Sequence, residues 1–130
     1  DENSLYNTPP MFTIWMTGKV LKWIEEQGGT EGLETASAAK ADAVYQVIDQ
    51  SDGFFRSPVA ISDRSHTNLV FRLPTEELET EFLAESARRG MMGLEGHVSV
   101  GGLRASMYAA LPEESVWALV DHMTSFRDRR

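Results

Sequence analysis

Glycines, a histidine and an arginine follow one another closely in Gly96-His97-Val98-Ser99-Val100-Gly101-Gly102-Leu103-Arg104-Ala105-Ser106-Met107-Tyr108. In a strand, successive side chains point to opposite faces. The second half of this segment alternates accordingly, with its apolar side chains on one face: Leu103, Ala105 and Met107. The other face takes its polar and aromatic side chains: Arg104, Ser106 and Tyr108. We therefore expect a strand whose apolar face lies in the core and whose opposite face presents Arg104.

Arg104 is a candidate for binding an anion, because its planar guanidinium matches two oxygens of a carboxylate or phosphate. Gly101 and Gly102 precede it and allow a ligand or another backbone segment to approach closely. The alternative is a surface ion pair with one of the 20 acidic residues. His97 is either an anion-binding or proton-transferring residue, or a hydrogen-bonded structural one. The residues alone leave these alternatives open.

The composition is that of one soluble domain: 130 residues, 42% hydrophobic and 25% charged. A net charge of -8 argues against nucleic acid and against an anionic membrane surface, since both bind clustered Lys and Arg. There are no cysteines, which excludes disulfides, thiolate catalysis and cysteine-based zinc sites. A reducing, cytoplasmic location is expected.

Several other functions lack their sequence signatures. The histidines at positions 66, 97 and 122 are far apart, so no metal site is expected. Polar residues interrupt the apolar stretch over 11–24, which therefore predicts no membrane span. A Ser/His/Asp signature, a phosphate-binding loop of the Walker type and a dinucleotide fingerprint are all missing.

The pattern of apolar residues predicts an α+β domain of two layers, with a small antiparallel or mixed sheet and helices packed largely on one face. Helices are expected over 11–27, 30–49, 75–89 (capped by Thr75) and from 112 onward. Strands are expected over 54–55, 68–73 and 103–108, with a further strand or edge segment over 91–95. The strand over 68–73 alternates as well, with Leu69, Phe71 and Leu73 on one side and Val70 and Arg72 on the other. It should neighbour the strand over 103–108. The predicted buried stripe of the second helix consists of Leu33, Ala36, Ala39, Ala43 and Val47.

The first helix is apolar almost all round over residues 11–16. A domain of this size has difficulty covering a helix on every side, so another domain or a second subunit is expected there, unless these residues fill the domain's own core. Asn7 and Thr8 precede this helix. They either cap it or, together with its free N–H groups, bind a phosphate.

Several ordered motifs resemble the C-terminal part of the phosphoserine aminotransferase family: Ser4 to Pro10, Trp23 to Gly29, Asp63-Arg64-Ser65, Gly96-His97 and Val100 to Tyr108. The resemblance implies a pyridoxal-phosphate enzyme with the aspartate-aminotransferase fold. Such enzymes work as cytoplasmic homodimers in serine biosynthesis. They transfer the amino group of glutamate to 3-phosphohydroxypyruvate, which gives phosphoserine and 2-oxoglutarate.

The resemblance also implies roles for individual residues. Asn7 and Thr8 match the pair that reaches the cofactor phosphate of the neighbouring subunit. Arg104 matches the arginine that binds the substrate α-carboxylate, and His97 matches a residue of the pocket for the substrate phosphate. The sequence departs from the family pattern at Val98, where the family usually has an arginine, and at Ala109, where it usually has an asparagine.

We expect residues 1–130 to form a single domain, the small C-terminal domain, with a connecting segment and long helix over 1–28 and an α+β core over 30–130. The resemblance implies that the cofactor-binding lysine belongs to a large domain that precedes residue 1. Lys19, Lys22 and Lys40 all fall in predicted helices, outside any cofactor motif. The chain alone is then expected to be inactive, to contribute no catalytic residue and not to hold pyridoxal phosphate. Its partners would be that large domain and a second subunit. The alternative is a stand-alone module for small anions or for protein interaction.

Overall fold

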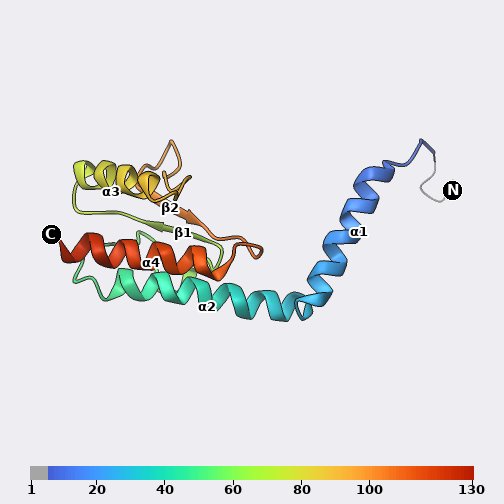
Figure 1. Ribbon diagram of the computed structural model, residues 1–130, viewed down its shortest axis with the longest axis horizontal. Coiled ribbons are helices and arrows are strands. Elements are labelled where there is room, and N and C mark those ends of the chain that lie inside the picture. The colour runs from blue at the N-terminus through green and yellow to red at the C-terminus, as the bar shows by residue number, and fades with distance from the viewer. Residues whose placement is uncertain (1–5) are drawn as a thin grey trace. The chain divides into compact units, whose positions relative to one another are not determined.

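The computed structural model describes residues 6–130, in which helices alternate with short strands (Figure 1). The chain divides into two compact units, Asp1–Glu34 and Thr35–Arg130. Ser4 and Leu5, which belong to the first of the motifs above, lie outside the described residues.

The first unit contains α1 (Met11–Glu26) and the beginning of α2 (Gly29–Asp49). The predicted helix is confirmed, but its predicted cap is wrong. Pro10 is the N-cap residue, and no side chain caps the helix. Two prolines, Pro9 and Pro10, lead directly into α1, so the helix starts too late for the side chain of Asn7 or Thr8 to reach its first N–H groups.

The second unit is organised around two antiparallel strands, β1 (Asn68–Phe71) and β2 (Leu103–Ser106). Their register places Val70 opposite Arg104. The predicted neighbourhood and alternation are both confirmed. Leu69, Phe71, Leu103 and Ala105 are buried on one face of the sheet. We call the other face, which carries Val70, Arg72, Arg104 and Ser106, the open face of the sheet.

The strand predicted over 54–55 is wrong as a strand, and the strand or edge segment predicted over 91–95 is present only as an edge segment beside β2. Each region contributes one isolated antiparallel bridge, Arg56 with Arg72 and Glu95 with Leu103, on the outer sides of β1 and β2. Gly and Pro residues bracket both bridges closely, at positions 53, 58, 93 and 96, so no ladder of consecutive pairs can develop.

Helices α2, α3 (Glu76–Arg88) and α4 (Glu113–Asp128) pack on the buried face of the sheet, as predicted. Aromatic side chains connect the helices with the sheet and with one another. Phe82 of α3 lies 6.1 Å from Phe71 of β1 and 5.2 Å from Phe126 of α4, measured between ring centroids. A short 3-10 helix, η1 (Ile61–Asp63), was not predicted. The result is the expected two-layer α+β arrangement, with an antiparallel sheet.

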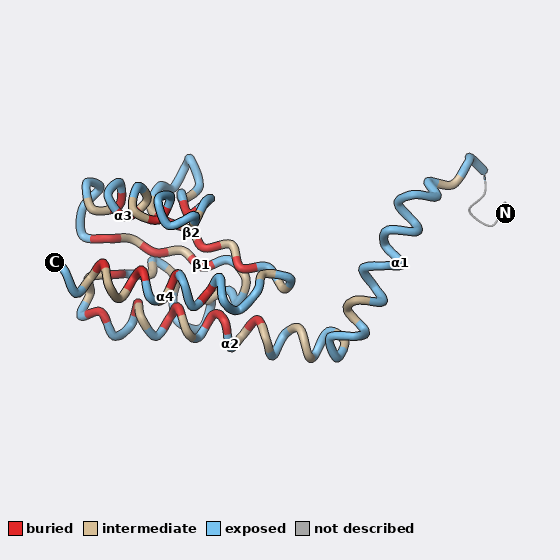
Figure 2. The backbone as a smooth tube through the Cα atoms, in the orientation of Figure 1, coloured by how far each residue is buried: buried red, intermediate tan, exposed pale blue. Residues whose placement is uncertain are grey.

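Burial along the helices shows one further correction (Figure 2). The predicted stripe of α2 is wrong by about one residue, and the side chains buried there are Ser37, Lys40, Ala41, Val44, Tyr45 and Ile48. The larger apolar surfaces of Val44, Tyr45 and Ile48 outweigh those of the alanines in deciding which side of the helix faces the core. In α4 the buried side chains include Val116, Leu119 and Met123.

Candidate functional site

Arg104 lies on the open face of the sheet and is half-buried. Its backbone N–H donates to the Leu94 carbonyl at 2.8 Å. Its side-chain Nε is buried and has no hydrogen-bond partner among the described residues. No ion pair within residues 6–130 includes it, although the chain has 20 acidic residues. A buried polar group without a partner needs an explanation, and a binding site for an outside anion provides one.

His97 lies in a tight turn that joins Gly96 to Gly102, whose backbone groups bond to each other at 2.9 Å. The His97 carbonyl accepts from the N–H groups of Val100 and Gly101 at 2.9 and 2.8 Å. Within the turn, the Ser99 N–H donates to Nδ1 of His97 at 3.2 Å. An Nδ1 that accepts this bond leaves the proton of the neutral ring on Nε2, which is then available as a donor. His97 is therefore a hydrogen-bonded residue of the turn and also has a free donor.

Arg72 connects this turn to the rest of the domain. Its Nη1 donates to the Val100 carbonyl at 3.0 Å, and its Nε lies 2.8 Å from Oε1 of Glu79. The buried Glu79 carboxylate also accepts the Leu73 N–H at 3.2 Å. Sequence reasoning missed both residues. The alternation over 68–73 did predict that Arg72 lies on the same face as Val70. No other sequence feature placed Arg72 close to Arg104.

Asn7 and Thr8 lie in the other unit, before α1, and both are exposed. Neither side chain makes a hydrogen bond to another described residue, since Pro10 takes the capping position. Arg104 lies on β2, and His97 lies on the turn that leads into this strand. Asn7 and Thr8 belong to a separate unit.

Each lysine is already engaged within the chain. Lys19 lies 5.5 Å from the centre of the Trp15 ring, and Lys22 lies 3.8 Å from Glu26. The Nζ of Lys40 is bonded to backbone carbonyls.

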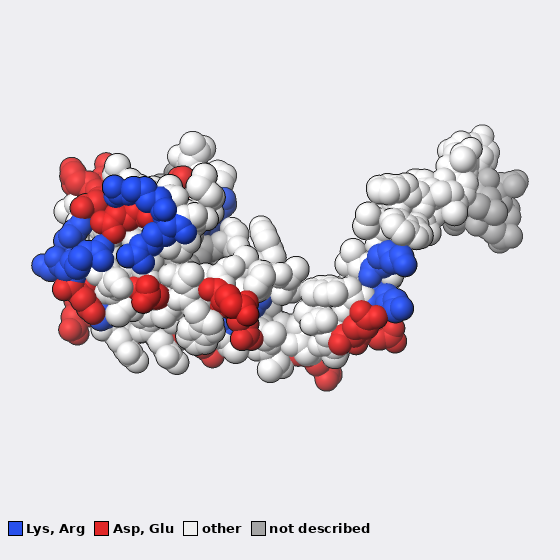
Figure 3. Space-filling view, viewed as in Figure 1, with Lys and Arg blue, Asp and Glu red and all other residues white. Residues whose placement is uncertain are grey.

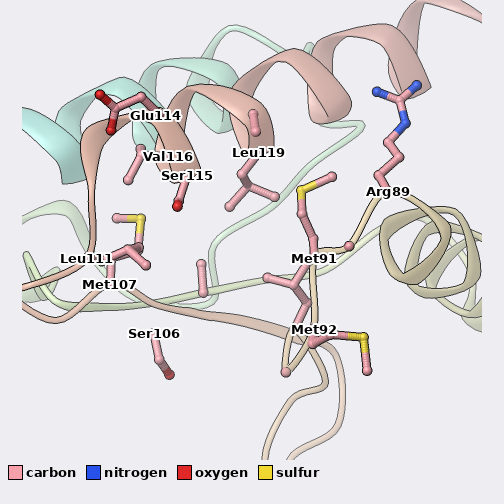
Figure 4. A pocket seen from close by; sticks show the side chains of 15 residues that line it. Arg89, Met91, Met92, Ser106, Met107, Leu111, Glu114, Ser115, Val116 and Leu119 are labelled. Atoms are coloured by element: carbon pink, nitrogen blue, oxygen red, sulfur yellow. The ribbon is translucent and has the colours of Figure 1, made fainter.

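One cavity has a volume of about 750 Å³ and is formed by the 91–94 segment, the outer edge of β2 and the first half of α4 (Figure 4). Met91, Met107, Leu111 and Leu119 make its lining mainly apolar. Neither Arg104 nor His97 contributes to it. The cavity is therefore distinct from the candidate anion site.

Arginines that follow α3 and α4 form ion pairs with acidic side chains. Figure 3 shows basic and acidic groups side by side over the ends of these two helices. Arg129 lies 2.6 Å from Glu85, and Arg89 lies 3.5 Å from Asp121. Within residues 6–130, no cluster of three or more His, Asp or Glu side chains is arranged to bind a metal ion. None of the helices in the described part of the chain has the length and apolar character to span a membrane.

Residues 1–119 match the family model of the class-V aminotransferases. The chain belongs to this family. Among curated class-V relatives, a phosphoserine aminotransferase of Niallia circulans is 56% identical over 128 residues, which are 98% of this chain and 35% of that protein. One of Herpetosiphon aurantiacus is 52% identical over 124 residues, 95% of this chain and 34% of the relative. The chain thus spans about a third of the length of these class-V relatives.

Solved class-V structures are similar to the chain over nearly its whole length. The phosphoserine aminotransferase from Bacillus circulans subsp. alkalophilus matches with a TM-score of 0.93 and 55% identity, over 99% of this chain and 36% of that one. A PLP-bound phosphoserine aminotransferase from Trichomonas vaginalis matches with a TM-score of 0.84 and 39% identity, over 95% and 35% of the two chains. The resemblance that the motifs indicated is confirmed, and so is the expected fold.

Proposed function

We propose that this chain is the C-terminal small domain of a phosphoserine aminotransferase, which transfers the amino group of glutamate to 3-phosphohydroxypyruvate in the cytoplasm. The observation that carries the proposal is Arg104, whose buried Nε has no partner among the described residues. The relatives named phosphoserine aminotransferase support the assignment, and the share of their length that this chain spans supports its being one part of the enzyme.

Arg104 binds the α-carboxylate of the substrate in this proposal. A guanidinium fixed on a strand presents its donors in a constant direction and can bind both carboxylate oxygens at once. Its neighbours on the open face, Val70 and Ser106, bring no charge that competes for it. The donors of Arg104 therefore remain available for a ligand.

His97 contributes to the pocket for the substrate phosphate. Its turn fixes Nδ1 as an acceptor, which leaves Nε2–H to donate to a phosphate oxygen. Val98, which follows it, is 99% exposed and has no donor to add. Binding of the phosphate consequently depends more on His97 than in relatives with an arginine at that position.

Asn7 and Thr8 would hold the phosphate of pyridoxal phosphate. The fit rests on their chemistry, because an amide and a hydroxyl are suitable donors and α1 does not use them for capping. When bound, the cofactor supplies an electron sink for the carbon that carries the amino group. Since Lys19, Lys22 and Lys40 are all engaged elsewhere, the lysine that joins the cofactor would come from a large domain outside this chain. The chain alone would be inactive.

The partners in this proposal are that large domain and a second subunit. No side chain of α1 is buried, and several large apolar ones are exposed: Met11, Phe12, Ile14, Trp15, Met16, Val20 and Leu21. Burial of so large an apolar surface is strongly favourable, which is typical of a helix that meets another domain or subunit.

The experiment is an Arg104→Ala substitution in the full-length enzyme. Loss of charge-assisted hydrogen bonds should lower kcat/KM for glutamate by about 1.5 to 3 kcal/mol, or roughly tenfold to 150-fold. The cofactor absorbance should stay unchanged. Arg88→Ala, which removes an exposed arginine of α3, is the matched control and should leave the kinetics as they are. Equal kinetics for Arg104→Ala and the parent enzyme would overturn the proposal.

A further inference from the structure

Lys40 is a lysine in an unusual environment. It lies in the middle of α2, and only 5% of its surface is exposed. No acidic side chain forms an ion pair with it in the described part of the chain. A charged ammonium is rarely buried without a counter-ion, because burial removes the water that solvates the charge. Other groups must therefore replace that water.

Backbone carbonyl groups replace the water around the ammonium group of Lys40. The Nζ of Lys40 donates to the carbonyl oxygens of Leu111, Ala109 and Tyr108 at 3.0, 3.1 and 3.4 Å. An ammonium group has three N–H donors, so each donor has its own acceptor. These acceptors lie 68 to 71 residues away along the chain. A single side chain of α2 thus holds a distant backbone segment.

That segment directly follows the strand that carries Arg104. β2 ends at Ser106, and the carbonyls that bind Lys40 begin at Tyr108. Between them, the Met107 N–H donates to the Thr67 carbonyl at 2.7 Å. The Leu111 N–H donates back to the Tyr108 carbonyl at 2.8 Å, which closes a turn. Lys40 therefore fastens the turn by which the chain leaves β2 for α4.

The opposite end of β2 is fastened in a comparable way. Arg72 donates to the Val100 carbonyl at 3.0 Å, just before β2 begins at Leu103. Cationic side chains from α2 and from the residue that follows β1 thus hold the backbone on either side of the strand. Arg72 is neutralised by Glu79, whereas the partners of Lys40 within residues 6–130 are backbone carbonyl oxygens.

We propose that Lys40 is a positioning residue for Arg104: through the 108–111 turn it fixes the C-terminal end of β2, and with it the direction in which the guanidinium meets the substrate carboxylate. This inference rests on the proposed function, because it assigns a task to Arg104. A bidentate contact needs both oxygens to meet their donors, and a displacement of about 1 Å can reduce an enzymatic rate about 100-fold. A turn that shifts after the loss of Lys40 would thus weaken substrate binding without removing any group that touches the substrate.

The test compares substitutions in the full-length enzyme loaded with its cofactor. Lys40→Met removes the ammonium and keeps an unbranched side chain of similar length. Ser51→Ala is the matched control, since Ser51 lies just after the C-terminal end of α2, is also buried, and bonds to the backbone of Ile48 and Phe55. Both should lower the melting temperature. Only Lys40→Met should raise KM for glutamate, by about tenfold, with kcat changed much less.

A double-mutant cycle distinguishes positioning from general destabilisation. If Lys40 acts through Arg104, Lys40→Met should have no further effect on kcat/KM in an Arg104→Ala background, because the group that it positions is gone. The inference would be overturned if kcat/KM of the double variant fell by the product of the two single-variant losses. It would also be overturned if Arg104→Ala raised KM and Lys40→Met left KM unchanged. If Arg104→Ala itself leaves KM unchanged, the result contradicts the proposed function, on which this inference rests. Lys40→Gln, judged by the same criteria, replaces Lys40→Met if that variant does not fold.

Discussion

Gly96 and Gly101 are packed so closely that a methyl group on Gly96 would overlap the Gly101 carbonyl oxygen and lie 2.7 Å from that of Gly102. The backbone on both sides of the His97 turn is in direct contact as a result. Gly102 adds a second requirement, because it has φ of +72° and its Cα lies against the Arg72 side chain. Glycines at these positions allow the turn to close onto β2.

Gly96→Ala should destabilise the chain by about 1 to 3 kcal/mol, because backbone atoms rather than a mobile side chain occupy the space. Gly18→Ala is the control. Gly18 lies within α1 with no atom within 4 Å of an added methyl group. That variant should stabilise the helix by about 0.5 to 1 kcal/mol. Urea unfolding of the three proteins measures both effects, and a neutral Gly96→Ala would contradict the close packing.

His122 should make the stability of the domain depend on pH. Its ring stacks on Phe82 with the centroids 4.5 Å apart, and neither ring nitrogen has a hydrogen-bond partner among residues 6–130. Burial lowers the pKa of His122, and the nearby Phe82 carbonyl offsets part of that shift. Arg89 and Arg129 lower the pKa further, whereas Glu85 raises it. The folded state therefore favours the neutral ring.

The direction in which pH changes the stability follows from the number of protons that the folded and unfolded chains bind. Between the lowered folded pKa and the ordinary value of about 6.5, the unfolded chain binds more protons than the folded one. The contribution of His122 is fully present above that ordinary value and is lost as pH falls below it. Melting temperatures measured from about pH 8 to about pH 5 should fall less for His122→Leu than for the parent chain. His66→Gln, which changes an exposed histidine, should follow the parent. Equal slopes for His122→Leu and the parent would be contrary to the prediction.

The sheet was predictable because one of its faces is buried. Alternation in β1 and β2 identified Leu69, Phe71 and Leu103 as core residues and Arg104 as a residue of the open face. Burial on one face constrains every second side chain, so the pattern appears directly in the sequence. The Thr75 cap was also predictable, since its side chain accepts from the Leu78 N–H, a local contact.

Contacts between distant backbone and side-chain groups were not predictable. A lysine in a helix is normally assigned to solvent, and the carbonyls that bind Lys40 have no signature in the sequence because every residue has one. The same applies to Arg72 and the Val100 carbonyl. The proposed roles of Arg104 and His97 came from a resemblance to a family. That Arg104 forms no ion pair among residues 6–130 could be seen only in the structure.

A substitution at Val98 can test the phosphate pocket by increasing, rather than decreasing, the affinity for the phosphorylated substrate. Its side chain is 99% exposed, so an arginine there meets no steric obstacle in this domain. In the full-length enzyme, Val98→Arg should add a charge-assisted hydrogen bond beside His97 and lower KM for phosphohydroxypyruvate by about tenfold or more, equivalent to at least about 1.5 kcal/mol. Val98→Gln, which adds a donor without a charge, is the control and should give a smaller gain. KM for unphosphorylated hydroxypyruvate should not change in either variant, because that substrate has no phosphate to bind. An equal improvement for both acceptors would argue against a phosphate pocket beside His97.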